Sequence, residues 1–201
     1  MLVFKEACLV LLAVPKTGTT ALETALNQHA DIAIMDPPEH KHCSVRVYNH
    51  EVRDFFETDQ GPAMELAAVI REPVDWLRSW HRYRARPELF GTPVSTQHVT
   101  FDAFVEGWLD DNQPDFAQIG RQSRFVDWSE GRTGVDHLFR YDRIDELMAF
   151  LGARLGQEIS LPMRNVSPDR HQPLSSPVLD RMRADAEEEF LLWDHVVRIC
   201  S

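Results

Sequence analysis

A short loop at residues 14–20 combines a lysine, a glycine and three threonines in the order Val-Pro-Lys-Thr-Gly-Thr-Thr. An apolar run at residues 7–14, typical of a buried strand, leads into it, and a helical pattern follows over residues 18–28. Backbone N–H groups and the positive end of a helix then face the same point and can bind an anion. The loop is not a Walker A motif, because the lysine precedes the only glycine. The sequence therefore predicts a phosphate site of another kind.

A second candidate phosphate site lies further along the chain. Arg71 ends a predicted buried strand at residues 66–70, and Pro73 suits the first turn of a following helix. An arginine fork binds a terminal phosphate with two hydrogen bonds, and Ser79 adds a hydroxyl nearly two turns into that helix. Arg78 is an alternative phosphate ligand, which we expect in a surface ion pair instead. The competing interpretation is a surface arginine and a solvent-facing serine.

Taken together, the two segments resemble the sulfotransferases that use 3′-phosphoadenosine 5′-phosphosulfate (PAPS). Residues 15–20 are similar to the 5′-phosphosulfate loop of that superfamily. Arg71, Pro73 and Ser79 match its 3′-phosphate pattern, in which an arginine ends a strand and a serine follows eight residues later. The resemblance runs from about residue 7 to the C-terminal helix, and its specificity lies in these two motifs.

This resemblance implies a role for each residue of the two motifs. Lys16 is expected to neutralise charge on the bridging and 5′-phosphate oxygens. The N–H groups and hydroxyls expected to bind the 5′-phosphate belong to Thr17, Gly18, Thr19 and Thr20. Arg71 and Ser79 are expected to bind the 3′-phosphate. Sulfuryl transfer needs in-line positioning, cationic stabilisation and a base, so PAPS is the expected co-substrate and no metal is required.

The catalytic base is expected between the two motifs, where the chain reads Glu39-His40-Lys41-His42. Histidine or glutamate fills this role across the superfamily, and we favour His42, with His40 and Glu39 as alternatives. On an extended segment, alternation would place His40 and His42 on one face and Glu39 and Lys41 on the other. A His-x-His zinc site lacks an obvious third ligand, so no metal is expected. A solvated polar loop is the remaining interpretation.

Two weaker similarities follow in the second half of the chain. Residues 137–141, followed by a helix from near Asp142, resemble a late strand–helix unit of the superfamily. The Leu-Pro…Asn-Val-Ser pattern at residues 161–167 is common in its carbohydrate and bacterial branches. Because that loop approaches the cofactor in relatives, Arg164 and Arg170 are candidate cofactor contacts, with surface exposure equally open. The aromatic candidates for adenine are Trp76, Trp80 and Phe125, each also suited to the core.

The order of elements predicts one α/β domain over residues 1–201. We expect a three-layer sandwich with a central, mainly parallel sheet of the P-loop NTPase-like type. Thr100 should cap an amphipathic helix at residues 101–109. Asp142 can cap a helix that begins near it, and Gly156 should end that helix. A last helix should begin at Ser176, with the acidic run at residues 187–189 on its solvated face.

Charge and hydropathy limit the partners. A net charge of −11 repels polyanions, so nucleic acid is not an expected partner. No apolar stretch approaches the ~20 residues of a membrane span, and a cytoplasmic protein is expected. The expected acceptor is a small molecule, lipid or glycan with a hydroxyl or amine. A P-loop small-molecule kinase and a non-catalytic, nucleotide-binding sulfotransferase homologue remain the alternative functions.

Overall fold

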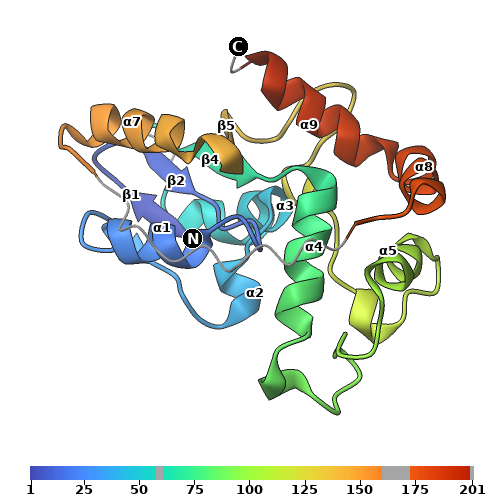
Figure 1. Cartoon of the computed structure of the whole chain (residues 1–201). Coiled ribbons are helices and arrows are strands. Elements are labelled where there is room, and N and C mark those ends of the chain that lie inside the picture. Colours follow the sequence, from blue (N-terminus) through green and yellow to red (C-terminus); the bar gives the residue numbers. More distant parts are fainter. Residues whose placement is uncertain (58–60, 160–172, 200–201) are drawn as a thin grey trace.

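The computed structural model describes residues 1–57, 61–159 and 173–199. Its centre is a five-stranded sheet with the strand order β3-β1-β2-β4-β5 (Figure 1). The strands are β1 (Leu2–Phe4), β2 (Leu9–Leu11), β3 (Ile32–Ala33), β4 (Glu65–Ile70) and β5 (His137–Arg140). The α-helices are α1 (Thr19–Leu26), α2 (Pro38–Lys41), α3 (Val45–Val47), α4 (Pro73–Arg84), α5 (Phe101–Leu109), α6 (Gln122–Phe125), α7 (Ile144–Leu155), α8 (Ser176–Asp185) and α9 (Glu187–Ile199).

The sheet is mixed, which corrects the prediction of a mainly parallel one. β2 pairs with β4 and β4 with β5 in parallel, whereas β1 is antiparallel to both of its neighbours, β2 and β3. β1 was not predicted from the sequence, and its short connection to β2 at residues 5–8 leaves room only for an antiparallel hairpin. The parallel half contains β2 and β4, which correspond to the predicted strands at 7–14 and 66–70, although residues 7 and 8 lie in the hairpin turn.

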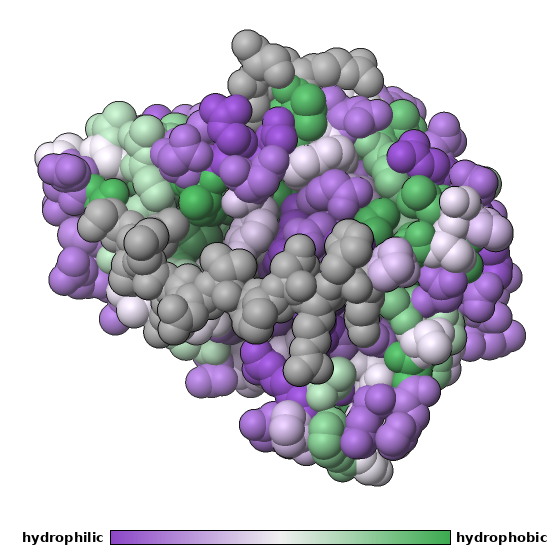
Figure 2. Space-filling model, viewed as in Figure 1, coloured by the Kyte–Doolittle hydropathy of each residue, from purple (hydrophilic) through white to green (hydrophobic). Residues whose placement is uncertain are grey.

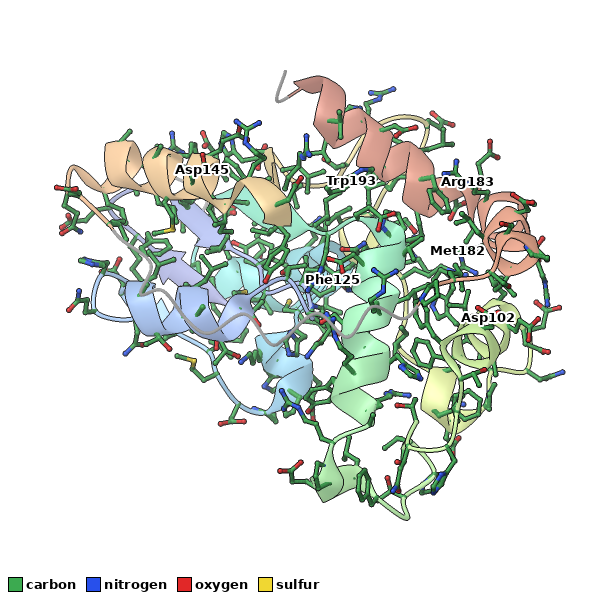
Figure 3. All side chains as sticks on the ribbon, in the orientation of Figure 1. Asp102, Phe125, Asp145, Met182, Arg183 and Trp193 are labelled. Atoms are coloured by element: carbon green, nitrogen blue, oxygen red, sulfur yellow. The ribbon has the colours of Figure 1, made fainter. Side chains whose placement is uncertain are left out.

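Helices cover both faces of the sheet, so the expected layered α/β arrangement is present. Side chains alternate along β4: Leu66, Ala68 and Ile70 pack with α3 and α9, whereas Ala67 and Val69 pack with α1 and α7. A further apolar cluster joins α4, α5 and α8 beside the sheet, and Met182 points from α8 into it (Figure 3). The sheet is thereby held from both sides, and α4 is fixed at its margin.

Most predicted helix ends are confirmed. Pro73 lies in the first turn of α4, and the Glu72 side chain accepts a hydrogen bond from the Asp75 N–H at 2.7 Å. Thr100 caps α5 by accepting from the Ala103 N–H. Gly156 ends α7 in the left-handed conformation, at φ 66°. These ends follow from local chemistry, which the sequence carries in full.

Asp142 does not cap a helix. It lies in a 3₁₀ turn, Tyr141–Arg143, and its carboxylate pairs with Arg140 at 2.6 Å, so α7 begins only at Ile144. Both carboxylate oxygens of Asp142 accept hydrogen bonds from the Arg140 guanidinium, and not from the backbone N–H groups that a cap would bind.

The C-terminal region also differs from the prediction. It forms two helices, α8 and α9, which meet at Ala186, and the N-cap of α8 is Ser175 rather than Ser176. Within the acidic run, Glu187 and Glu188 are exposed, but Glu189 is only 2% exposed. The break between the helices turns Glu189 toward α6, where its carboxylate finds backbone donors.

The parallel strands bring the predicted phosphate segments to one edge of the sheet. β2, β4 and β5 end side by side, so the loop after β2, Arg71 after β4 and Tyr141 after β5 are neighbours. After β2 the chain forms β3 at one edge of the sheet, and it then forms β4 on the opposite side of β2. In open α/β sheets, ligands bind in the crevice at such a switch point.

Candidate functional site

A cleft of about 680 Å³ opens at this edge of the sheet. Of the site residues predicted from the sequence, the cleft is lined by Lys16, Gly18, Thr19, Thr20, His42, Arg71 and Ser79. The other lining residues are Pro15, Ala21, Met35, Asp36, Pro38, Lys41, Trp80, Tyr83 and Tyr141. Figure 2 shows hydrophilic residues near the middle of the molecule in this view. One cleft therefore unites both phosphate motifs and the favoured base.

The loop before α1 is shaped by two residues in the left-handed conformation. Lys16 has φ 67° and Gly18 has φ 80°, and Gly18 is the N-cap of α1. The Thr17 hydroxyl, in contrast, is buried and donates to the Val14 carbonyl at 2.8 Å. The structure thus differs from the expectation that this hydroxyl faces the phosphate, because it is used to close the end of the strand. Of Thr17, only the main chain can contribute to the site.

Gly18 is required both for its backbone conformation and for space. A Cβ atom at this position would lie 3.0 Å from Cε2 of Tyr141. We expect Gly18→Ala to lower the free energy of unfolding by about 1–2 kcal/mol for the positive φ, plus the cost of displacing the tyrosine ring. Urea unfolding measures this loss.

The matched control is Gly91→Ala. Gly91 has φ 77°, yet a Cβ there would meet nothing within 4 Å. The difference between the two variants isolates the contact with Tyr141. Equal losses would show that the ring moves aside at no cost, and that the close approach is unimportant.

Lys16 projects across the cleft against aromatic rings. Its Nζ lies 4.0 Å from the ring centre of Tyr83 and 5.8 Å from that of Trp80, and no described carboxylate pairs with it. Burial, and to a smaller extent the nearby charges of Arg86, Arg71 and Arg82, together lower the pKa of Lys16 to about 8. A partly desolvated ammonium in contact with aromatic faces is well suited to bind an anion.

Arg71 is fixed in several directions. Its Nε donates to Asp75 Oδ2 at 2.5 Å, its Nη1 donates to the Lys16 carbonyl at 3.2 Å, and its Cζ lies 4.4 Å from the ring centre of Tyr141. Ser79 lies eight residues further, on α4, and lines the same cleft. Arg78 lies 3.5 Å from Asp75, in the ion pair that was expected of it.

His42 has the geometry of a general base. Its Nδ1 lies 2.7 Å from the Ala13 carbonyl oxygen, and since a carbonyl can only accept, Nδ1 carries the proton. The neutral ring then has its lone pair on Nε2. Burial lowers the pKa of His42, so this neutral form prevails at neutral pH. Lys41, beside it, pairs with Glu23 of α1 at 2.8 Å and thereby connects α2 to α1.

The two alternative bases lie elsewhere, because the segment is not extended. Pro38 begins the helical turn α2, as proline in a first turn favours, and the alternation predicted for residues 39–42 is wrong. His40 is exposed and borders a separate apolar cavity of about 520 Å³, next to Cys43. Glu39 is exposed and lies outside the lining of the cleft.

The three aromatic candidates for an adenine contact lie in different environments. Trp76 is 2% exposed, and its Nε1 donates to the Pro15 carbonyl at 2.9 Å, which joins α4 to the loop before α1. Phe125, labelled in Figure 3, packs against the core, whereas Trp80 lines the cleft. Tyr83 was missed, although its spacing of four residues from Ser79 places both on one helix face.

Three further points concern residues and features other than the cleft lining. Arg164 and Arg170 lie outside the described residues. Within the described ranges, no three His, Cys, Asp or Glu side chains gather as metal ligands would. No described helix is long and apolar enough to cross a membrane.

Comparisons of the chain with protein-family models, with curated proteins and with solved structures found no match. The function of the cleft must therefore be inferred from its residues and their placement.

Proposed function

We propose that this protein is a PAPS-dependent sulfotransferase with a P-loop NTPase-like fold. The single observation that carries the proposal is the cleft itself, since it is lined by Lys16, His42, Arg71 and Ser79, which come from three separate segments. The N-terminus of α1, with Gly18, Thr19 and Thr20, would bind the 5′-phosphate. Arg71 and Ser79 would bind the 3′-phosphate, and Thr17 would contribute its N–H alone.

The proposed reaction is an in-line displacement at sulfur. His42 Nε2 accepts the proton of the acceptor hydroxyl or amine while the acceptor atom bonds to sulfur. The bond between sulfur and the bridging oxygen breaks, and its electron pair stays on the 5′-phosphate of 3′-phosphoadenosine 5′-phosphate (PAP). The Lys16 ammonium stabilises the charge that develops on that leaving oxygen. The acceptor is a small molecule, lipid or glycan.

PAP binding tests this proposal. By calorimetry without added metal, we expect the wild type to bind PAP and Arg71→Ala to bind it at least about tenfold more weakly, since a charge-assisted contact to phosphate is lost. Arg132→Ala, which removes an exposed arginine remote from the cleft lining, is the matched control and should bind as the wild type does.

Parallel titration with ATP and Mg²⁺ addresses the kinase alternative. Preference for ATP with Mg²⁺ over PAP, or no binding of PAP, would contradict the proposal. PAP binding without sulfuryl transfer to any screened acceptor would favour the non-catalytic, nucleotide-binding alternative.

A further inference from the structure

Arg71 is held through its main chain by a residue far away in the sequence. The last ladder pair of β4 is Ile70 with Arg140, so the peptide groups of Arg71 lie beyond the parallel ladder. The Gln122 side chain supplies partners for both: its Oε1 accepts from the Arg71 N–H at 2.9 Å, and its Nε2 donates to the Arg71 carbonyl at 2.8 Å. One side-chain amide therefore continues the strand pairing at the residue that carries the guanidinium.

Gln122 is held in turn by a buried carboxylate. Glu189 of α9 accepts from the Gln122 N–H at 3.2 Å and from the Ser123 N–H at 3.0 Å, one with each oxygen. Glu189 and Gln122 are each 2% exposed. Burial raises the pKa of Glu189, as expected for a carboxylate removed from water. Such a costly group is retained only with its hydrogen-bond partners in place.

The segment around Gln122 is anchored on its other side as well. The Nε1 of Trp108 donates to the Gly120 carbonyl at 2.8 Å, and the Arg121 guanidinium lies 4.5 Å from the centre of the Trp108 ring. The position of the Gln122 amide is thus fixed by α5 and α9 together. Neither helix lines the cleft; Gln122 connects them to Arg71, and both helices also pack on α4.

We propose that Gln122 and Glu189 are positioning residues, which orient Arg71 and thereby set the preference of the site for a ligand with a 3′-phosphate. This inference rests on the proposed function. Its physical basis is that an arginine recognises phosphate through paired N–H donors, whose alignment depends on where the main chain holds the side chain. Asp75 and the Lys16 carbonyl fix the guanidinium at its far end, and Gln122 fixes its root.

The test measures the ratio of the dissociation constants of AMP and PAP, which differ only by the 3′-phosphate. Gln122→Met removes both hydrogen bonds to Arg71 at similar side-chain length. Glu189→Gln keeps the shape but replaces one acceptor oxygen with an NH₂ group. We expect each variant to lower the ratio about tenfold with little change in AMP binding, since only the 3′-phosphate contact is disturbed.

Two matched controls accompany these variants. Gln97→Met and Glu188→Gln make the same chemical changes at exposed positions and should keep the wild-type ratio. A partly unfolded variant would bind both ligands more weakly, but the ratio would stay unchanged, so a fold defect does not imitate the expected result. In an Arg71→Ala background, Gln122→Met should lower the ratio no further, because the contact it orients is already gone.

The outcomes separate the inference from the proposed function. A wild type that prefers PAP, with both variants keeping that preference, would overturn the positioning role and leave the sulfotransferase proposal standing. A wild type with equal affinity for PAP and AMP would overturn both. Additive losses in the double variant would also overturn the inference, because Gln122 would then act independently of Arg71.

Discussion

Lys16→Met is expected to lower the turnover number of sulfuryl transfer by about 10²–10³-fold, or roughly 3–4 kcal/mol of transition-state stabilisation. Methionine keeps most of the length of the side chain but removes the ammonium group, whose nitrogen lies 4.0 Å from the ring centre of Tyr83. That charge lies in a partly desolvated cleft with no described carboxylate beside it, so it is available for the leaving phosphate. The measurement is the rate of PAP release from PAPS with a hydroxyl acceptor found by screening.

The pH dependence gives Lys16 a separate signature. Because its pKa is lowered to about 8, the ammonium is present below that pH and is lost as the pH rises through it. In the wild type, kcat/KM should therefore fall above about pH 8, and this fall should be absent in Lys16→Met.

Lys5→Met, at an exposed residue, is the control for the loss of a lysine. If Lys16→Met weakened PAPS binding but kept the turnover number within about threefold, Lys16 would bind the ground state and transition state equally, and its proposed catalytic role would be wrong.

His42→Gln is expected to lower the turnover number by about 10²–10⁴-fold, the usual contribution of a general base, with PAP affinity unchanged. Glutamine can still donate to the Ala13 carbonyl, which Nδ1 does in the wild type, but it has no basic nitrogen to face the acceptor. Steady-state rates and PAP calorimetry on the same variant separate proton transfer from donor binding.

The pH profile and two control variants decide whether His42 is the base. Since burial lowers its pKa, its basic form should already prevail at neutral pH, and kcat/KM should fall only on the acidic side of the ordinary histidine range. That acidic limb should vanish in His42→Gln. His40→Gln and Glu39→Gln should keep wild-type rates, because neither residue lines the cleft. A large loss in either control, with His42→Gln active, would move the base to that residue.

The local elements were predictable from the sequence because their causes are local. The strand, glycine-containing loop and helix at residues 7–28 follow from hydrophobic pattern and turn chemistry, as do Pro73 in the first turn of α4, the Thr100 cap and the glycine end of α7. The pairing of two phosphate motifs at neighbouring strand ends was also implied, since parallel strands place their carboxyl ends together.

Errors arose where a specific partner, distant or close in sequence, decides the local structure. Glu189 was expected in solvent, but donors 66 and 67 residues away in sequence bury it. Asp142 pairs with Arg140 instead of capping a helix, and the hairpin of β1 makes the sheet mixed. Only the burial of Glu189 depends on a long-range contact; Asp142 pairs with a side chain two residues away, and β1 pairs with β2 across a short turn.

The sequence by itself determined which residues could bind phosphate and in which order they occur, because residue type and spacing carry that chemistry. Tertiary structure alone decided the rest. It separated His42 from His40 and Glu39, placed Lys16 on Tyr83, and fixed Arg71 through Gln122. These outcomes depend on which segments meet at the ends of the strands, and contacts between segments far apart in the chain leave no periodic signal in the sequence.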